Sequence, residues 1–312
     1  MTEREAAALL RGWDDILILN HRRPDGDAVG SAAGLCAALR AMDKRAFVLE
    51  NPDEGVSFHV WSRPYLAPAD FVPAHVVSVD TAERSMLQTN AGDLAVELAI
   101  DHHMSHVPYA DHTCVTNRSS CGEIILEIVW DLTIPTREIA APLYVALTTD
   151  TGCFRYGNTS AATHRAAAEL MRTGIDALSV HRTFFIEKSL CRLRLEALLT
   201  QGMEIRGDTV IVSVTQAQLN ELGATVDDLD DLANFARQVR DTSVGVTLQE
   251  LADGQCKVSL RTAPGIDASA VCALLGGGGH PAAAGCTLPG PVEAAREQVL
   301  AALEAYRGKT PV

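Results

Sequence analysis

Three side chains of the kinds that bind metal ions lie within seven residues of one another near the start of the chain. His21, Asp25 and Asp27 follow a short apolar run, Ile16–Leu19, which predicts a buried strand. Open α/β sheets bind ligands on loops that leave the carboxyl ends of such strands. Two carboxylates this close together repel each other unless a cation or a proton neutralises one of them. The stretch therefore predicts a metal site, and the alternative is an acidic turn that caps the next helix.

Further carboxylate and imidazole groups occur where other apolar runs end. They are Asp80 after Val76–Val79, Asp101-His102-His103 after Leu98–Ile100, and Asp150 after Leu143–Leu147. Parallel strands bring their carboxyl ends to one edge of a sheet, so the first two of these groups should meet the first stretch. Asp150 joins them only if its loop lies over the same edge. A single aspartate in such a position is usually a cap or a turn residue, but four such segments favour a metal centre.

The donor types indicate which metal would bind. The set is rich in carboxylates, includes imidazole and contains no thiolate, which suits Mn²⁺, or alternatively Mg²⁺, better than a structural zinc ion. Six or more candidate ligands exceed what one ion needs. We therefore expect two divalent ions about 3.5–4 Å apart, an arrangement that stabilises both oxygens of an in-line displacement.

The composition limits the class of protein. The chain has 312 residues, of which 47% are hydrophobic and 21% charged, and its formal net charge is −14. This charge argues against a stable complex with long nucleic acid, although bound cations would still allow small phosphorylated substrates. Eight scattered cysteines without a CxxC pair are typical of the reducing cytoplasm. We see neither a signal peptide nor a membrane-spanning run, so a cytoplasmic location without a membrane partner is expected.

The elements that must position these groups fall into two parts. Strand and helix patterns alternate over residues 1–180, which predicts an α/β domain with a doubly wound, mainly parallel sheet. A helical linker is expected over 181–205, with one long helix over 180–201. Residues 206–312 predict a smaller α+β domain with a mixed sheet. Its expected strands are 209–214, 243–248 and 257–261, and its expected helices are 229–240, 268–274 and 292–306.

Taken together, these motifs resemble those of the DHH phosphoesterases. The matching residues are His21, Asp25, Asp27, Asp80, Asp101-His102-His103 and Asp150. Gly276-Gly-Gly-Gly-His280, followed by residues 282–285, resembles the substrate-binding motif of the DHHA1 domain. The resemblance covers roughly residues 15–305 and is specific because all five motifs occur in order. It is greatest for the two-domain nanoRNase and pAp phosphatase branch, which degrades short oligonucleotides and sometimes cyclic dinucleotides.

The resemblance implies a role for each matching residue in the metal centre. One ion would be held by His21, Asp25 and Asp80, and the other by Asp27, Asp80, His102 and Asp150, so that Asp80 bridges them. Asp101 would orient its neighbours without binding metal. His103 would contact a phosphate or give a proton to the leaving oxygen, unless it is a further ligand or a packing residue. A hydroxide shared by both ions would attack phosphorus in the interdomain cleft.

Substrate would be held by a second set of residues. Gly277, Gly278 and Gly279 would offer backbone N–H groups to a phosphate, and His280 a side-chain contact. A flexible turn is the alternative for this segment. Arg261 would bind phosphate or lie on the surface of its strand, and Arg155 would contact substrate or brace its loop. His106 and His112 are interpreted as loop residues.

We therefore expect a metal-dependent phosphoesterase. It would hydrolyse short oligoribonucleotides or dinucleotides to nucleoside monophosphates, or pAp to AMP and phosphate. The alternatives are a phosphodiesterase for cyclic or linear dinucleotides, an inorganic pyrophosphatase, and a degenerate metal-binding or nucleotide-binding protein. A pyrophosphatase would normally have a basic signature in its second domain that we do not find, and the full ligand set argues against degeneration. The sequence leaves a homodimer open.

Overall fold

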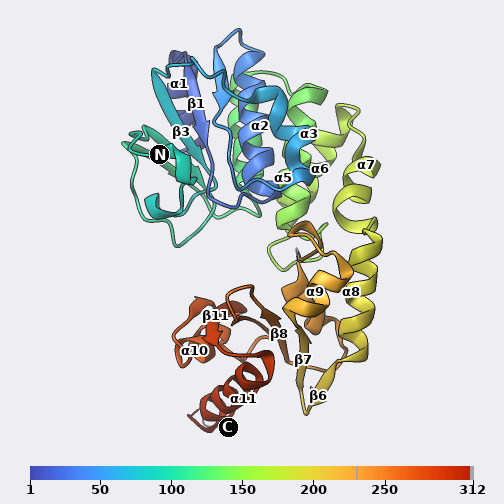
Figure 1. Cartoon of the computed structure of the whole chain (residues 1–312). Helices are drawn as coiled ribbons and strands as arrows, with labels where there is room; N and C mark the ends of the chain where they lie inside the picture. The colour runs from blue at the N-terminus through green and yellow to red at the C-terminus, as the bar shows by residue number, and fades with distance from the viewer. Residues whose placement is uncertain (230, 310–312) are drawn as a thin grey trace. The chain divides into compact units, whose positions relative to one another are not determined.

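The chain forms two compact units, Met1–Glu187 and Lys188–Val312 (Figure 1). The structure, a computed structural model, describes residues 1–229 and 231–309, so residue 230 and the last three residues of the predicted second domain lie outside the described residues. Each unit has its own sheet, of five strands in unit 1 and six in unit 2. The division between the units falls inside the linker predicted over 181–205.

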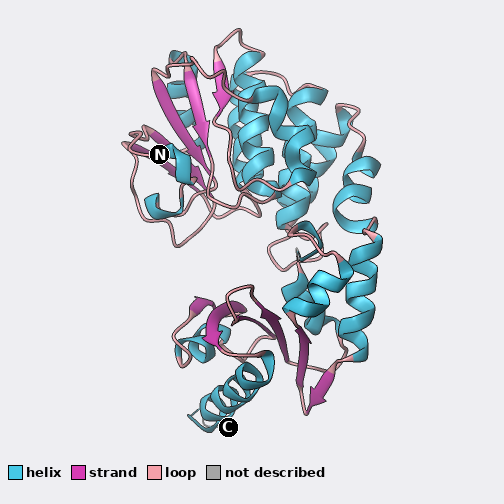
Figure 2. Ribbon diagram, viewed as in Figure 1, coloured by secondary structure: helices cyan, strands magenta, loops and turns pink. Residues whose placement is uncertain are grey.

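The sheet of unit 1 is entirely parallel, as predicted. Its strands are β1 (Ile16–Leu19), β2 (Ala46–Val48), β3 (His75–Val79), β4 (Leu98–Asp101) and β5 (His112–Val115). They lie in the order β2-β1-β3-β4-β5, and Figure 2 draws the strands in magenta. This is a doubly wound order in which the direction of winding reverses between β1 and β3, and such sheets bind ligands at the carboxyl ends beside that reversal. The predicted α/β class is confirmed.

The long helices of unit 1 are stacked on one face of this sheet. They are α1 (Glu3–Gly12), α2 (Gly26–Arg40), α4 (Cys121–Leu132), α5 (Arg137–Asp150) and α6 (Ala161–Arg172). Helices α2 and α4 contact the strands, α5 packs against both, and α6 packs on α5 (Figure 1). Their apolar side chains form one buried core. The other face of the sheet is covered by loops and short helices around Leu19, Leu87 and Val96.

Short helical segments complete unit 1. They are η1 (Val56–Phe58), α3 (His59–Ser62), η2 (Arg63–Tyr65), η3 (Arg84–Met86), η4 (Thr89–Ala91), α7 (Ala177–His181) and the π-helical η5 (Arg182–Ile186). The helix predicted over 180–201 is therefore not continuous. The chain leaves the helical path after η5, and Ser189 then caps the separate helix α8 by accepting a hydrogen bond from the backbone N–H of Arg192.

Unit 2 has the predicted mixed sheet. Its strands are β6 (Glu204–Arg206), β7 (Thr209–Val214), β8 (Val244–Glu250), β9 (Gln255–Thr262), β10 (Gly278–His280) and β11 (Ala283–Pro289). Their order is β10-β11-β9-β8-β7-β6, and only β7 and β8 are parallel. The helical segments are α8 (Leu190–Gln201), α9 (Gln216–Leu222), η6 (Asp227–Leu229), η7 (Leu232–Gln238), α10 (Ala268–Ala273) and α11 (Val292–Lys309). Helices α10 and α11 share one core with β8, β9 and β11, while α8, α9 and η7 share another with β7.

Two local predictions for unit 2 are corrected by the structure. The helix expected over 229–240 is the 3₁₀ segment η7, which packs against β8 and β9. The predicted glycine loop continues into strand β10, because Gly278–His280 pair with Ala283–Gly285 of β11. Such pairing gives backbone N–H and C=O groups at the open edge of the sheet hydrogen-bond partners.

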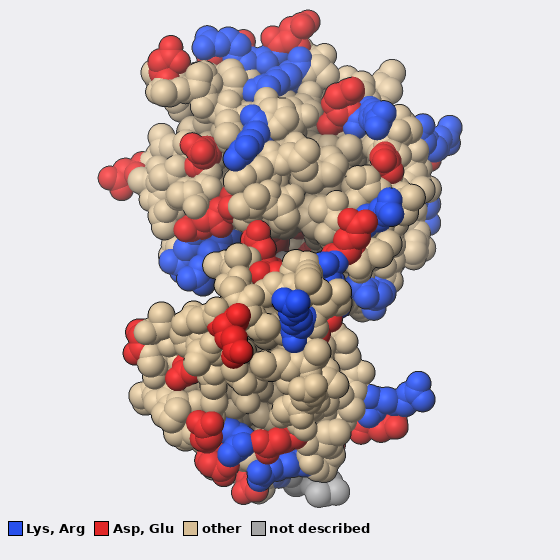
Figure 3. Space-filling model, turned by 45° about the vertical axis from the view of Figure 1, so that its right-hand side comes forward, with Lys and Arg blue, Asp and Glu red and all other residues tan. Residues whose placement is uncertain are grey.

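Charged side chains are mixed in sign on the face drawn in Figure 3. Lys and Arg groups alternate with Asp and Glu groups over both units, and large areas of other residues separate them. The described residues on this face present no continuous basic band of the kind that binds long nucleic acid. Of the helices in residues 1–229 and 231–309, none is both long and apolar enough to cross a membrane.

Glycine allows α2 and α5 to pack closely. A Cβ atom added to Gly30 would lie 2.8 Å from the backbone nitrogen of Ala146 and closer still to the carbonyl oxygen of Pro142. Real Cβ atoms do not approach backbone that closely, so the two helices would have to separate. The separation would also move the start of α2, where Asp27 lies, and the end of α5, where Asp150 lies.

We predict that Gly30→Ala destabilises unit 1 by about 1–3 kcal/mol, the usual cost of overpacking a core. Urea unfolding followed by tryptophan fluorescence measures this, because Trp13, Trp61 and Trp130 all lie in unit 1. Gly12→Ala is the control, since a Cβ atom there has no neighbour within 4 Å. Equal stability of the two variants would contradict the close packing of α2 on α5.

Candidate metal centre

Six predicted metal ligands meet at the carboxyl edge of the unit 1 sheet. Their donor atoms form two groups, within which all donor atoms lie within 4.8 Å of one another. The groups are His21 with Asp25 and Asp80, and Asp27 with His102 and Asp150. A third such group contains Asp80, His102 and His103. The structure thus brings these side chains together, while their role as ligands stays a prediction.

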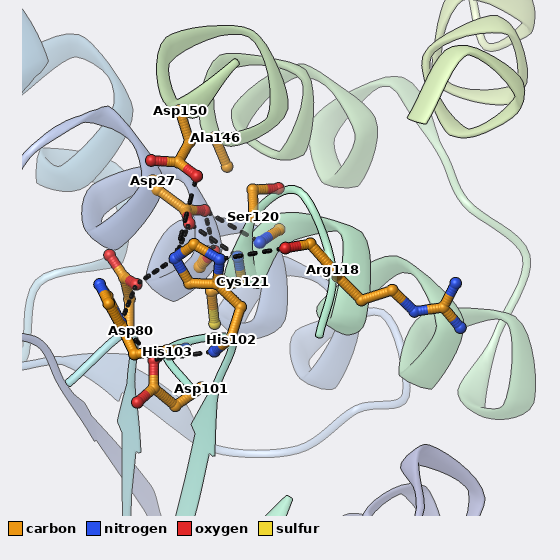
Figure 4. A network of polar contacts seen from close by, with 12 residues as sticks. Asp27, Asp80, Asp101, His102, His103, Arg118, Ser120, Cys121, Ala146 and Asp150 are labelled. Carbon is orange, nitrogen blue, oxygen red and sulfur yellow. Dashed lines mark hydrogen bonds and ion pairs between the residues drawn. The ribbon is translucent and has the colours of Figure 1, made fainter. Parts of the chain in front are cut away.

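Asp80 is the residue around which the others are arranged. Its Oδ2 lies 3.6 Å from Nε2 of His21. Its Oδ1 lies 3.5 Å from Nε2 of His102, and Figure 4 shows these two residues. The residue follows β3 directly and adopts a left-handed conformation with φ of 51°, which aspartate tolerates better than most residues. It is 3% exposed. Among the described residues, Oδ1 has no hydrogen-bond partner. A buried oxygen without a partner destabilises the fold, and a cation bound to that oxygen would remove this cost.

Two of the histidines are oriented to offer Nε2 to a metal. Nδ1 of His21 lies 2.9 Å from the carbonyl oxygen of Arg22, and Nδ1 of His102 lies 3.3 Å from that of Arg118. Because a carbonyl only accepts hydrogen bonds, the proton of each neutral ring is placed on Nδ1. The lone pair of Nε2 is then directed at the carboxylates, as in many metal sites.

The two carboxylates of the first motif are held by helix N-termini. Asp25 caps α2, its Oδ1 accepting hydrogen bonds from the backbone N–H groups of Asp27 and Ala28. This cap starts α2 at Gly26, so Asp27 lies in the first helical turn.

Asp27 is also bound by the start of α4. Its Oδ2 accepts a hydrogen bond from the backbone N–H of Cys121 at 2.7 Å, and its Oδ1 accepts one from that of Gly122 at 2.9 Å. The two amides orient the buried carboxylate and stabilise its charge.

Asp150 comes from the end of a helix, whereas the sequence predicted a loop. It is the last residue of α5, and its Oδ2 lies 3.8 Å from Nε2 of His102. Asn158 donates hydrogen bonds from Nδ2 to the carbonyl oxygen of Asp150 at 3.1 Å and to its Oδ2 at 3.4 Å. Arg155 donates from Nε to the carbonyl oxygen of Gly152. That contact braces the loop, and a contact of Arg155 with substrate stays a prediction.

The electrostatics of the site favour positive charge. Burial raises the pKa of Asp27 well above its ordinary value, and the charges of Asp80 and Asp150 add to the effect. Burial likewise raises the pKa of Asp150 to about 7. Burial alone would lower the pKa of His21, but the hydrogen bond to Asp80 and the charge of Asp25 raise it to about 9. Protons therefore occupy the ion-free site at neutral pH, and divalent cations would displace them.

Asp101 lies behind the metal ligands and contacts two histidines. Its Oδ1 accepts a hydrogen bond from Nδ1 of His103 at 2.7 Å, and its Oδ2 accepts one from Nδ1 of His106 at 2.7 Å. The hydrogen bond to Asp101 raises the pKa of His103 to about 9, against the opposing effect of burial. Burial alone would raise the pKa of Asp101, but these histidines hold it below its ordinary value.

His106 lies in the loop after β4, as predicted, whereas His112, for which a loop was also predicted, is the first residue of strand β5. The loop prediction did not include the contact that His106 makes. Its side chain is 4% exposed and directed at the buried Asp101 carboxylate. The only sequence signal was its position three residues after the tandem histidines, and without the turn between His103 and His106 that spacing predicts no contact.

The predicted substrate-binding residues of unit 2 lie together on its sheet. The register pairs Arg261 of β9 with Ala283 of β11, and Ala283 with His280 of β10, so these three residues form one row across the strands. Residues paired in this way point to the same face. His280 is exposed, and Arg261 donates a hydrogen bond from Nε to Oδ1 of Asn234 at 2.9 Å. Binding of substrate by this row stays a prediction.

Both units of the chain match families of known proteins. Residues 15–175 match the DHH family, N-terminal domain, and residues 207–309 match the DHHA1 domain. The chain is 33% identical over 294 residues to the bifunctional oligoribonuclease and PAP phosphatase NrnA of Thermus thermophilus, covering 92% of this chain and 89% of that protein.

Solved structures share the fold. An exopolyphosphatase-related protein from Bacteroides fragilis is 23% identical and has a TM-score of 0.88, with 98% of this chain and 96% of that chain covered. RecJ from Thermus thermophilus in complex with Mn²⁺ is 15% identical with a TM-score of 0.56, covering 99% of this chain and 55% of that chain.

We predict that the melting temperature of the ion-free protein decreases as the pH is raised from about 5 to about 9. A raised pKa means that the folded state binds the proton more tightly than the unfolded state does. The stabilisation is complete below the unfolded pKa and is lost as the pH rises through the folded pKa. This loss occurs up to about pH 7 for Asp150 and up to about pH 9 for His21 and His103.

Differential scanning fluorimetry in chelator and in Mn²⁺ measures this dependence. The increase in melting temperature caused by Mn²⁺ should be larger at pH 8 than at pH 5, because protons compete with the ion. Asp150→Asn is the control and should show a shallower fall in chelator. A melting temperature in chelator that rises from pH 5 to pH 9 would show that the carboxylates do not repel one another as described.

Proposed function

The chain belongs to the DHH family, and from that premise we propose that it is a metal-dependent phosphoesterase for short nucleotides. It hydrolyses short oligoribonucleotides to nucleoside monophosphates and pAp to AMP and phosphate. The name of the Thermus thermophilus relative gives both activities, and the similarity extends over both units. The observation that supports the proposal most is the group of carboxylates and imidazoles around Asp80, whose buried Oδ1 has no partner among the described residues.

Two divalent ions are proposed, with Mn²⁺ preferred and Mg²⁺ as the alternative. One would be held by His21, Asp25 and Asp80, and the other by Asp27, Asp80, His102 and Asp150. The predominance of carboxylate donors suits these hard cations, and a structural relative binds Mn²⁺. Such ions supply a water of lowered pKa and offset the charge of the phosphoryl oxygens.

His103 is the proposed proton donor to the leaving oxygen. Its Nδ1 is bound to the carboxylate of Asp101, which leaves Nε2 as the nitrogen that can reach a substrate. The side chain is 34% exposed, whereas Asp101 is fully buried. In the ion-free protein the hydrogen bond to Asp101 raises the pKa of His103 to about 9, and a protonated imidazole is the form that can give a proton to a leaving group.

The row on the unit 2 sheet is the proposed phosphate-binding surface. Ala283 lies between Arg261 and His280, and its small side chain leaves space between the two larger ones. Neighbouring strands are about 4.8 Å apart, so residues two strands apart can contact one phosphate group from both sides. The edge strand β10 also has backbone N–H groups that no further strand takes up. A second phosphate bound here would favour short substrates that have a terminal phosphate.

Other assignments of the same site remain open to test. A phosphodiesterase for cyclic or linear dinucleotides would use the same metal ligands and differ in how unit 2 binds the substrate.

The eight cysteines are all free thiols, which supports the proposed location in the reducing cytoplasm.

A substrate panel tests the proposed function. Protein reloaded with Mn²⁺ is incubated with pApA, pAp, a short RNA, a cyclic dinucleotide and pyrophosphate, and kcat/KM is compared. We expect the highest values for the linear dinucleotide and pAp. Asp80→Asn is the control and should lower kcat by several orders of magnitude on every substrate, because the residue contributes to both ion sites. Faster turnover of pyrophosphate or of the cyclic dinucleotide would replace the proposed substrate class.

A second prediction tests the phosphate-binding surface. His280→Ala should lower kcat/KM for pApA by roughly 10- to 200-fold, the equivalent of one charge-assisted contact of about 1.5–3 kcal/mol. A minimal phosphodiester without a second phosphate should be affected much less, and the Mn²⁺ content should not change. The control is Thr287→Ala, an exposed position further along β11. If His280→Ala slows both substrates equally, the residue does not bind a remote phosphate.

A further inference from the structure

The loop that follows β4 closes around one buried carboxylate. Oδ1 of Asp101 accepts hydrogen bonds from the backbone N–H groups of His102 and His103 and from Nδ1 of His103 (Figure 4). The other oxygen, Oδ2, accepts one from Nδ1 of His106 at 2.7 Å. Two imidazoles thus hold opposite oxygens of a carboxylate that has no exposed surface. This pair of contacts makes His106 part of the arrangement that orients His103.

A turn in the backbone places His106 at this position. The backbone N–H of His106 donates to the carbonyl oxygen of His103 at 3.0 Å, and the N–H of Val107 donates to that of Ala82 at 2.8 Å. The imidazole ring of His106 lies beside the phenol ring of Tyr109, with 5.5 Å between the ring centroids. The turn sets the position of the backbone, and the tyrosine ring limits the space that the imidazole of His106 can take.

Neither packing nor metal binding explains this histidine. Nε2 of His106 is buried and has no hydrogen-bond partner among the described residues. A buried polar atom without a partner destabilises the fold, so an apolar side chain would fill the same space at lower cost. The groups of potential metal ligands in residues 1–229 and 231–309 do not include His106. What remains is the contact of its other nitrogen with Asp101.

The carboxylate of Asp80 is a second possible acceptor for the Nδ1 proton of His103, so the contact between His106 and Asp101 affects where the His103 ring points. Nδ1 of His103 lies 2.7 Å from Oδ1 of Asp101 but also 3.6 Å from Oδ1 of Asp80. A carboxylate that turns about its Cβ–Cγ bond would weaken the first contact and allow the ring to turn toward the second. The hydrogen bond from His106 to Oδ2 opposes that rotation, together with the backbone N–H groups of His102 and His103 that bind Oδ1.

We propose that His106 is a positioning residue, which fixes the carboxylate of Asp101 through Nδ1 and thereby keeps the ring of His103 aimed away from Asp80. The effect on catalysis rests on the proposed function, in which His103 donates the proton. His106 itself does not touch the substrate. Partners of this kind, one layer behind the reacting groups, commonly change activity by about 10- to 100-fold when they are removed.

Two polar variants separate a positioning role from a structural one. Asparagine has its side-chain N–H₂ near the place of Nδ1, whereas glutamine extends it toward the place of Nε2. We expect His106→Gln and His106→Leu to lower kcat for pApA by about 10- to 100-fold, with KM and Mn²⁺ content unchanged. The kcat of His106→Asn should be at least tenfold higher than that of His106→Gln. His112→Asn, at an exposed histidine of β5, is the matched control.

A second measurement is independent of activity. In ¹⁵N-labelled protein, the Nδ1 proton of His103 should give a downfield signal from its hydrogen bond to Asp101. The signal should persist in His106→Asn and shift or broaden in His106→Leu. Wild-type kcat in His106→Leu, or equal losses in all three variants, would overturn the positioning role. If the wild-type protein cleaves no phosphoester at all, the proposed function fails, and the Nδ1 signal still decides whether His106 positions His103.

Discussion

The mutual repulsion of carboxylates gathered at one sheet edge is the constraint on which unit 1 depends. Asp80 and Asp27 are buried beside Asp150 and within reach of Asp25. In a medium of low polarity these charges cannot coexist without protons or cations, and the raised pKa values of Asp27 and Asp150 express that conflict. The fold holds these groups close together from three separate elements, which are the start of α2, the end of β3 and the end of α5.

The packing of the helices is what brings these elements together. Asp27 lies in the first turn of α2 and Asp150 is the last residue of α5. The two helices approach closely because Gly26 and Gly30 have no side chain. Gly122 has the same effect at the start of α4, where a Cβ atom would meet the side chain of Ala146. The backbone N–H groups of α4 can therefore reach the carboxylate of Asp27. Backbone that approaches this closely also excludes water, which strengthens the electrostatic interactions in the site.

The two units offer different chemistry. Unit 1 collects anionic and imidazole groups that suit cations, whereas the row of Arg261 and His280 in unit 2 suits an anion. Under the proposed function, unit 1 would bind the reacting phosphate and unit 2 a second phosphate. Such division lets binding energy from a remote group contribute to the reaction at the other. In this proposal the preference for short substrates would reside in unit 2 and the chemistry in unit 1.

The sequence by itself determined the kinds of groups and their order along the chain. The apolar runs before Asp80 and Asp101 predict parallel strands, and parallel strands end at one edge, so convergence of these residues follows from local pattern and topology. Residue types alone also indicated hard cations, and the motif spacing indicated the DHH family, which the match over residues 15–175 confirms. The tertiary structure decided what depends on the path of loops and on contacts between distant segments. It placed Asp150 at a helix end, turned the chain so that His106 reaches Asp101, and paired Gly278–His280 as an edge strand. Spacing along the chain does not specify such contacts, because a turn or an edge pairing is selected by the packing around it.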